Sequence, residues 1–577
     1  MKKSVWISVL VGITIVVGMA HGGVQIEAPT VMEDALLSIT VSDFHGLVDG
    51  LGTAAAQVSP MMNATTIKSL VGMQLGDPML AGIPAGKGLA VVALDPTTVF
   101  GILELAPGQV AAYTNKLGTA GMQCRYGNGV LVAAKTAAAI TKGVAASASV
   151  RRTLLARRSP TIRIGMKPAA YIAANTEQIQ GMLQMMTASM NKGMEAQAKM
   201  QGQPAASATE GTVKILEGEM LILLSLLKQV EAMEIVVTAA EGSLQLDEVI
   251  LPAAGSRVAT LVNAPKQNSW HPKVQSGDTG SAAFMIDFLI ENTAALSAFI
   301  SAETEQLISD MALETENVQR ISDYMQKCMA VCGGAVSESI FGGTGAGLNM
   351  DYVMEVSDEK AALDMLKNME TELKSTGFLD LYAGMGMPMS FEYKEKVRQH
   401  KGVDIHQFRT KISMDQMPEM QRQQMEAMNL TDMKYEVAVF DGLMAYSMGD
   451  TTMESIIDKI KSTGTSPSPL VARKVFPAGG FYYGDTDIGR YLEFVTQMMP
   501  KMPGNPMPFD KIAMTLQGAP PITSAAHVSG GLVQWSTNIP GALLARFGQA
   551  ALAIQMQQMQ QQMKAPAPAP APARSHP

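Results

Sequence analysis

Charged residues are scarce in this chain. Asp, Glu, Lys and Arg make up 17% of its 577 residues, against roughly 25% in an average soluble domain. The formal net charge is −8, and no long basic run occurs. Nucleic-acid binding needs clustered cations that displace counterions, so this composition argues against a nucleic-acid partner. The hydrophobic content of 47% also excludes a polar, disordered chain.

Histidine and cysteine are rare too, with seven and three residues. The sequence lacks the His-Glu-x-x-His, Gly-x-Ser-x-Gly and phosphate-loop patterns of common enzymes. "SMNK" (189–192) has the Ser-x-x-Lys spacing of penicillin-binding enzymes, but both copies of "KSTG" (374–377 and 461–464) fall at the ends of predicted helices. We therefore expect a protein that is not an enzyme, with no catalytic residue and no cofactor.

Long apolar runs are confined to the N-terminus. Two lysines precede an apolar stretch from Val5 to Val17, and Gly18 and Ala20 fit the small residues of a signal-peptidase site. We predict a signal peptide over 1–20 and a periplasmic or secreted mature protein. An uncleaved anchor is the alternative, although the run is short for crossing about 30 Å of hydrocarbon. No later segment has about 18 continuous apolar residues, so no integral membrane span is expected after cleavage.

Similar segments recur in the same order along the chain. Asn128-Gly129 and Asp441-Gly442 both predict a hairpin turn, and a strand and a helix cap (Thr136 or Asp450) follow each turn. Gln245 matches Gln534 in another pair of segments. The matched pairs are 35–51 with 282–299, 101–113 with 351–364, 128–140 with 441–453, 162–172 with 481–492, and 242–252 with 531–540. This order indicates an internal duplication.

The duplication divides the chain into a first α+β repeat (34–265), a polar linker (266–280) and a second α+β repeat (281–547). Asx-Gly turns join antiparallel neighbours, and the strands alternate with helices. We therefore predict an α+β fold, with two tandem copies of an antiparallel sheet and helices packed on one face of each.

The remaining segments distinguish the two halves. The second repeat has an insertion at 378–434, for which Lys401-Gly402 predicts an added hairpin and the methionines predict a helix. We expect this insertion to shape a cleft between the repeats. In the first repeat, 191–211 has the composition of a mobile loop. Residues 548–577 are expected to form a Gln/Met-rich helix end and a disordered Ala-Pro tail.

Methionine is the main compositional anomaly, with 45 residues against 15 Phe. Thioethers bind Cu(I) and also adapt to apolar partners. The candidate soft-metal ligands are Met325, Cys328, Met329 and Cys332, although the two cysteines could instead form a local disulfide or stay as buried thiols. The methionines follow a chain-wide bias and lack nearby His, so we rank an adaptable apolar surface above copper binding.

The duplicated layout with unequal insertions resembles secreted bacterial families of unknown function built from tandem α+β repeats. The resemblance covers most of the mature chain, and it implies the fold but no functional residue. Our hypothesis is an exported, non-enzymatic binding or scaffold protein that recognises an apolar ligand or an envelope protein partner between its two repeats. A periplasmic carrier of lipid or hydrophobic peptide and a Cu(I)-handling protein are the alternatives, followed by a hydrolase without a recognisable motif.

Overall fold

The structure is a computed structural model of the chain. It describes residues 26–157, 159–200, 220–240, 242–274, 282–311, 315–342, 348–375, 388–413, 431–449, 452–462, 470–498 and 509–564, together with Leu379, Arg422 and Glu426. The predicted signal peptide, the Ala-Pro tail and the Met-rich part of the insertion lie outside these residues.

The strands form one antiparallel sheet of 18 strands. Their bounds are β1 (Leu37–Val41), β2 (Leu89–Asp95), β3 (Thr98–Glu104), β4 (Gln123–Gly127), β5 (Val130–Ala134), β6 (Thr161–Met166), β7 (Val230–Ala240), β8 (Ser243–Pro252), β9 (Phe284–Leu289), β10 (Cys332–Gly342), β11 (Leu348–Val356), β12 (Met389–His400), β13 (Val403–Ile412), β14 (Asp432–Phe440), β15 (Leu443–Met448), β16 (Tyr482–Thr486), β17 (Ile522–Ser529) and β18 (Leu532–Ile539). The pairings place them in the order β4-β5-β3-β2-β1-β6-β7-β8-β18-β17-β16-β9-β10-β11-β15-β14-β13-β12.

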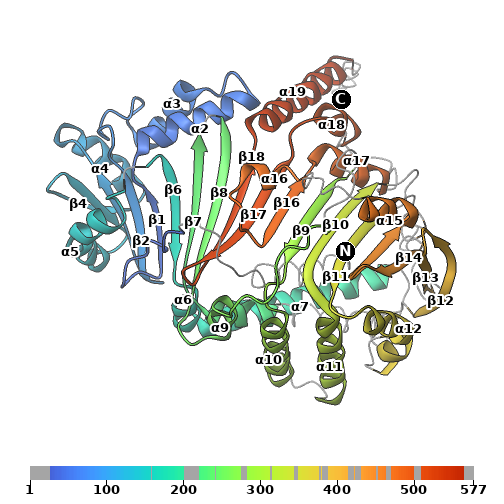
Figure 1. The fold of residues 1–577 in the computed structure, drawn as a ribbon. Helices are drawn as coiled ribbons and strands as arrows, with labels where there is room; N and C mark the ends of the chain where they lie inside the picture. The colour runs from blue at the N-terminus through green and yellow to red at the C-terminus, as the bar shows by residue number, and fades with distance from the viewer. Residues whose placement is uncertain are drawn as a thin grey trace, which may run out of the picture.

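The helices lie mostly beyond and beside the strand ends (Figure 1). Their bounds are α2 (Phe44–Val58), α3 (Ala64–Leu75), α4 (Val110–Thr119), α5 (Ala137–Thr153), α6 (Pro168–Ala174), α7 (Thr176–Met200), α9 (Arg257–Val262), α10 (Thr293–Met311), α11 (Thr315–Val331), α12 (Glu359–Ser375), α15 (Met453–Lys461), α16 (Ala472–Val475), α17 (Ile488–Met498), α18 (Phe509–Leu516) and α19 (Gly541–Lys564). A short 3₁₀ turn, η1 (Pro107–Gln109), precedes α4, and 220–228 is helical. Of the helices described, none combines the length and apolar character needed to cross a membrane.

The two halves of the sheet have the same strand order. Outward from the central β8–β18 pair, one half runs β7-β6-β1-β2-β3-β5-β4 and the other runs β17-β16-β9-β10-β11-β15-β14. Every matched strand therefore occupies the corresponding sheet position, as a duplication would require. The Asn128-Gly129 and Asp441-Gly442 turns match in conformation, with φ of 54° and 76° against 54° and 73°.

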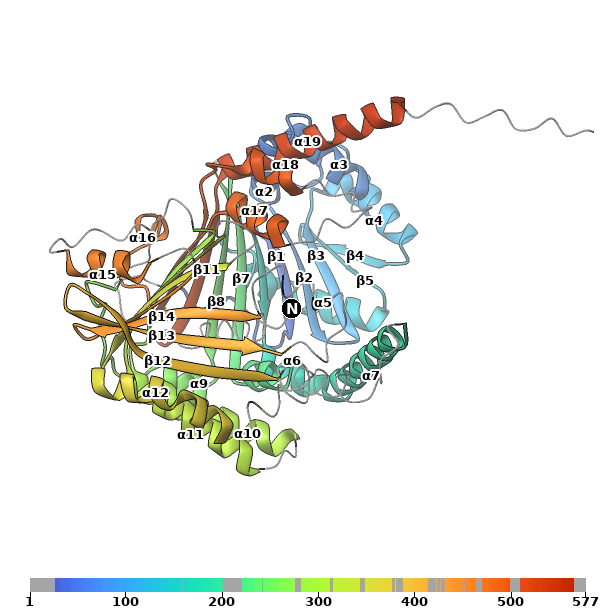
Figure 2. The same ribbon diagram turned by 90° about the vertical axis from the view of Figure 1, so that its right-hand side faces the viewer.

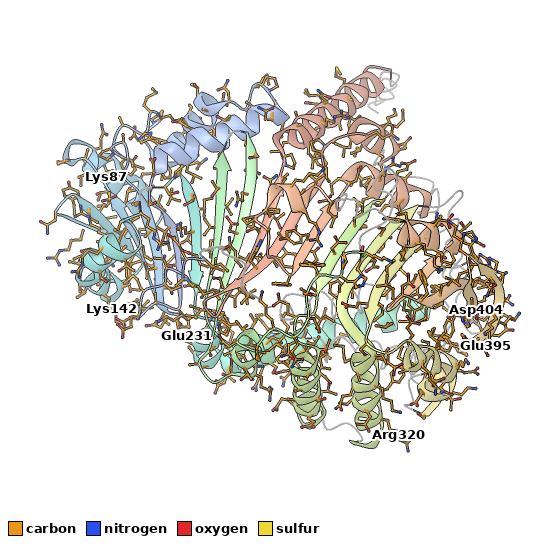
Figure 3. All side chains as sticks on the ribbon, viewed as in Figure 1. Lys87, Lys142, Glu231, Arg320, Glu395 and Asp404 are labelled. Atoms are coloured by element: carbon orange, nitrogen blue, oxygen red, sulfur yellow. The ribbon has the colours of Figure 1, made fainter. Side chains whose placement is uncertain are left out.

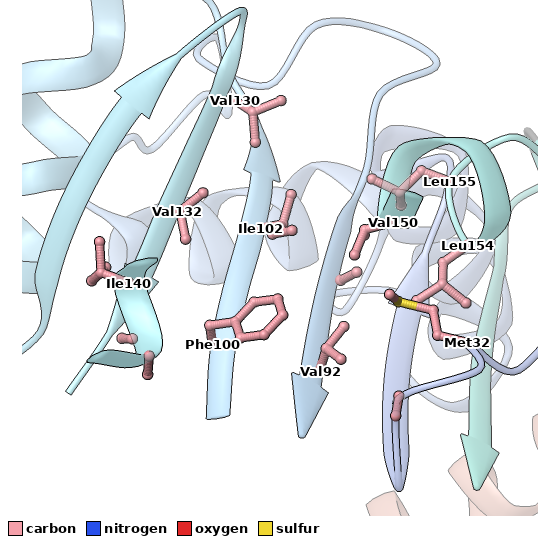
Figure 4. Close-up of a cluster of buried hydrophobic side chains, with 14 residues drawn as sticks. Met32, Val92, Phe100, Ile102, Val130, Val132, Ile140, Val150, Leu154 and Leu155 are labelled. Atoms are coloured by element: carbon pink, nitrogen blue, oxygen red, sulfur yellow. The ribbon is translucent and has the colours of Figure 1, made fainter. Parts of the chain in front are cut away.

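The α+β class with an antiparallel sheet is confirmed, but two details differ from the sequence-based expectation. The halves share one continuous sheet, and helices cover both faces of its outer parts. In the first half, α5 packs on a cluster that includes Val92, Phe100 and Ile102 (Figure 4), whereas α2 packs on Val41 and Leu131 from the opposite face. The reason is local: β5 is apolar and buried at all five positions, so both of its sides need covering.

The halves also exchange helices across the junction. The helix that follows β18, α19, packs on α2 of the first half, and the helix that follows β8, α9, packs on α10 of the second half. The crossing of α19 and α2 is close, because a Cβ atom on Gly548 would lie 1.7 Å from the backbone oxygen of Val58. Neither half therefore completes its own covering of the sheet.

The insertion in the second half adds the β12–β13 hairpin. Its turn at Lys401-Gly402 is confirmed, with both residues at positive φ. The hairpin pairs with β14 at the far edge of the sheet, where Glu395 and Asp404 lie (Figure 3). In the strand order the described part of the insertion therefore extends the outer edge of the second half, and the expectation that it shapes a cleft between the halves stays a prediction.

Three local predictions also need correction. The segment 191–211 is not a loop over its first part, because α7 continues to Met200. The cap position of α15 is Thr452, and the predicted cap Asp450 lies outside the described residues. The described part of the linker, 266–274, packs on the protein, since Val274 is buried and Trp270 Nε1 donates a hydrogen bond to the Gly480 carbonyl (3.2 Å).

A candidate apolar binding face

Several strands place polar side chains on one face of the sheet, here called the covered face, and apolar side chains on the opposite, accessible face. Strand β1 shows the pattern, because alternate residues of a strand point to opposite faces. Ser38 and Thr40 are 1% and 2% exposed, whereas Ile39 between them is 37% exposed. This reverses the usual arrangement, in which the apolar side of an amphipathic strand faces the core.

The same reversal occurs in both halves. In β7, Glu234 is buried and its neighbour Ile235 is half-buried. In β9, Asp287 is 0% exposed, whereas Ile286 and Phe288 on either side are half-buried. The reversal therefore occurs in both halves, whereas β2 and β3 keep the apolar residues Val92, Phe100 and Ile102 on the covered face.

Strand register aligns the accessible apolar residues into one band. Direct cross-strand partners run from Val91 through Ile39, Ile164 and Ile235 to Glu248. The band continues into the second half through Trp535, the partner of Glu248. Strand β17 contributes only the fully buried Ala526 between Trp535 and Tyr482, and beyond Phe288 the band shifts by two residues, to Ile286 and its partner Glu338. We call the following set the apolar strip: Val91, Ile39, Ile164, Ile235, Glu248, Trp535, Tyr482, Ile286, Phe288, Glu338, Tyr352 and Tyr446.

Helices cover the strand ends on either side of the apolar strip. Helix α2 packs on Val41 and the partly buried Ile162, on the same face as Ile39. Helices α9 and α10 cover the opposite ends of their strands, where they share a cluster with Ile250. Three members of the strip, Phe288, Tyr482 and Trp535, pack against the same cluster, so this part of the strip is partly covered. Figures 1 and 2 show these two groups of helices at the two ends of the strands. The middle of the face is left less covered, and Val91 is 38% exposed there.

The strip is aliphatic in the first half and aromatic in the second half. The rings of Tyr482 and Trp535 lie 4.5 Å apart between centroids, and those of Tyr352 and Tyr446 lie 5.8 Å apart, edge to face. Gly484 is needed for this packing, because a Cβ atom there would lie 2.5 Å from the Tyr482 hydroxyl oxygen. The aromatic residues thus form two ring pairs on the same face as the aliphatic residues.

Two carboxyl groups interrupt the apolar strip. Glu248 lies opposite Trp535, and Glu338 lies opposite Tyr352. Burial raises the pKa of both carboxyl groups above the ordinary value for Glu. Among the described residues, no hydrogen-bond or ion-pair partner is found for either side chain, and both are partly accessible to water.

The covered face carries the paired charges instead. Arg473 Nε lies 2.9 Å from the carboxylate of the fully buried Asp287, and its guanidinium lies against the rings of Trp270 and Tyr483, 4.1 and 4.7 Å from their centroids. Asp485 accepts hydrogen bonds from the backbone N–H groups that begin α16. These groups hold α16 and the linker on the sheet, and their closed pairing fits a structural role.

A hydrogen-bonded group lies at the β8–β18 junction. Asp247 is the direct partner of Ser536, whose Oγ donates to Asp247 Oδ1 over 2.5 Å. Gln534 donates to the same oxygen (3.3 Å), and Gln245 donates to Oδ2 of Asp247 (3.0 Å). Gln245 precedes Asp247 by two residues, and Gln534 precedes Ser536 by two residues. A two-fold rotation about the Asp247–Ser536 pair would therefore place Gln245 on Gln534, as the sequence match requires.

The candidate soft-metal residues are only partly brought together. Cys328 and Met329 lie in the last turns of α11, and Cys332 begins β10; the Met325 side chain lies outside the described residues. Both cysteines are free thiols, and burial raises the pKa of Cys332 to about 11 and that of Cys328 above its usual value. Thiols of this kind are poor metal ligands at neutral pH.

No group of three or more His, Cys, Asp or Glu side chains suited to a metal ion occurs within the described residues. The copper hypothesis and the expectation that the protein is not an enzyme therefore stay predictions. The sequence-based reasoning missed the apolar strip, since its members come from many strands. One local signal was present: in "LSITV" (37–41), Ser and Thr alternate with apolar residues, but alternation alone does not indicate which face is covered.

Comparison of the chain with protein-family models, with curated proteins and with solved structures finds no match.

Proposed function

We propose that this protein binds an elongated apolar ligand, a long-chain amphiphile, along the apolar strip. The observation that carries the proposal is the exposure of apolar side chains on one face of the sheet: Ile39 and Val91 are more than a third exposed, while the polar Ser38, Thr40 and Asp287 are buried on the other face. A face that stays apolar although it is accessible is typical of a binding surface.

The shape of the apolar strip favours an extended chain. From Val91 on β2 to Tyr352 on β11 the strip crosses ten strand-to-strand steps, and at about 4.8 Å each these span roughly 50 Å. Across the strands it is narrow, because helices cover the residues on either side. A long, narrow apolar surface fits acyl chains better than a globular partner.

The strip crosses the β8–β18 junction, so a ligand bound along it would contact both halves. This supports the hypothesis of apolar recognition by the two halves together, and it favours the lipid-carrier alternative over a scaffold. A bound chain would remove exposed apolar surface from water, which contributes about 25 cal/mol of binding free energy per Å². Export of the protein remains part of this proposal, and it depends on the N-terminal residues 1–20.

The natural tryptophans provide the test. Trp535 lies in the apolar strip, Trp270 lies on the covered face, and Trp6 lies in the predicted signal peptide. Two proteins are needed, both with Trp6→Phe: one with Trp270→Phe, which reports on Trp535, and one with Trp535→Phe, which reports on Trp270. A long-chain alcohol with bromine in its chain is the probe.

Saturable quenching of Trp535, with little effect on Trp270, is the expected result, because bromine quenches only at close range. Equal quenching of both tryptophans, or no saturation, would contradict binding along the strip.

A further inference from the structure

The aliphatic part of the apolar strip ends at a carboxyl group. Val91, Ile39, Ile164 and Ile235 are successive cross-strand partners, and Glu248 is the next partner in the row. Four steps of about 4.8 Å separate β2 from β8, or roughly 20 Å. This length is comparable with one extended hexadecyl chain.

Glu248 combines a carboxylate with an aromatic face. Its direct partner on β18 is Trp535, whose ring packs at 4.5 Å on Tyr482. The Trp535 indole N–H donates to Thr537 Oγ1 (3.2 Å), which fixes the orientation of the ring. Carboxylates and aromatic faces both attract cations, and the attraction is stronger where water is excluded.

The charge of the strip is of one sign. Its members include two glutamates and no Lys, Arg or His. An anionic headgroup would find no cation among these residues, and it would be repelled by the carboxylates. A neutral headgroup would leave the Glu248 carboxylate without a charged partner.

We infer that the ligand carries a cationic head, which Glu248 and Trp535 hold, and that its chain lies along Ile235, Ile164, Ile39 and Val91. The inference rests on the proposed function and adds the charge and the direction of the ligand. The raised pKa of Glu248 supports it, because an unpaired, half-buried carboxylate gains most from a cation.

Glu338 provides a matched control within the strip. It is also a half-buried glutamate with a raised pKa and an aromatic cross-strand partner, Tyr352. It lies on β10, in the aromatic half and away from the exposed aliphatic residues. Glu338→Gln therefore removes an equivalent carboxylate at a place where the inference puts no head.

The experiment measures binding of hexadecylamine, hexadecanol and hexadecanoic acid below micelle formation, by competition with the brominated alcohol that quenches Trp535. The proteins are the unchanged chain, Glu248→Gln and Glu338→Gln. The unchanged protein should bind the amine at least about tenfold more tightly than the alcohol. Glu248→Gln should lose this preference and keep its affinity for the alcohol, which shows that the variant is folded. Glu338→Gln should keep the preference.

Equal affinity for amine and alcohol in the unchanged protein would overturn the inference while leaving the proposed function in place. So would tightest binding of the acid, or loss of the preference in Glu338→Gln but not in Glu248→Gln. If none of the three compounds binds, the proposed function fails, and this inference fails with it.

Discussion

Single buried charges on the covered face are held by specific partners. Arg473 is the clearest case, because it joins the fully buried Asp287 to the rings of Trp270 and Tyr483. Replacement of one partner of a buried ion pair leaves the other charge buried and uncompensated. The resulting loss of stability is larger than the net contribution of the intact pair. Glu291 differs, because burial outweighs the effect of Lys266 at 3.4 Å and raises its pKa to about 7.

Arg473→Leu should lower the free energy of unfolding by about 3 kcal/mol or more, because it leaves the Asp287 carboxylate buried without its guanidinium. The measurement is denaturant unfolding at neutral pH. Lys474→Leu, at the exposed next position, is the control and should change little. Addition of Asp287→Asn to Arg473→Leu should recover part of the loss; a double variant less stable than Arg473→Leu would contradict this account.

The carboxyl group of Glu291 should make stability fall as pH rises. Its ordinary pKa is 4.5 and its folded value is about 7, so between these values the native state holds a proton that the unfolded state has lost. The free energy of unfolding should therefore fall by about 3 kcal/mol as the pH rises from about 4.5 to about 8. Glu291→Gln should remove this component from unfolding curves measured across that range. The exposed Glu305→Gln serves as the control, and the same pH slope in both variants would refute the prediction.

At the scale of elements, glycine decides where helices can approach each other. Gly548 lets α19 lie against the end of α2, whereas Gly181 in α7 has open space around its Cα. The two positions therefore separate the packing role of a helical glycine from its cost in backbone entropy.

Gly548→Ala should destabilise the protein by about 1–3 kcal/mol, because the new methyl group would overlap the Val58 backbone. Gly181→Ala should stabilise it by up to about 1 kcal/mol, since nothing lies near the new Cβ atom. Thermal unfolding of the two variants is the measurement. Destabilisation of similar size at both positions would contradict the close helix crossing.

The elements that the sequence predicted best are those with a local physical cause. Asn128-Gly129, Asp441-Gly442 and Lys401-Gly402 are turns because few other residues tolerate positive φ. Thr136 was also predicted correctly as a cap, and it accepts a hydrogen bond from the N–H of Ala139 (3.2 Å). The apolar strip depends on register between strands distant in sequence, such as β8 and β18, and no local pattern specifies that register.

For the whole molecule, the shared strand order of the two halves supports the proposal of an internal duplication. The junction between the halves consists of the β8–β18 pairing and the reciprocal helix contacts of α19 with α2 and α9 with α10. Separation of the halves would remove these contacts. Each half would then have an open sheet edge and an uncovered helix face.

Residues 21–265 and 281–577, expressed separately, should therefore be insoluble or aggregated, whereas co-expression should give a soluble one-to-one complex. Size-exclusion chromatography of the three preparations is the measurement. A soluble, monomeric and cooperatively unfolding half would show that the two units fold independently.

The central claim is that the accessible face of the sheet binds an apolar ligand, and native mass spectrometry of protein purified from the organism that makes it tests this most directly. The account predicts a bound small molecule that organic solvent extracts and that Ile39→Asp removes, because the substitution places a carboxylate in the exposed aliphatic part of the strip. Exposed Thr65→Asp, on α3, is the control and should retain the molecule. The bare mass of the chain in every preparation, or an adduct that survives Ile39→Asp unchanged, would contradict the claim.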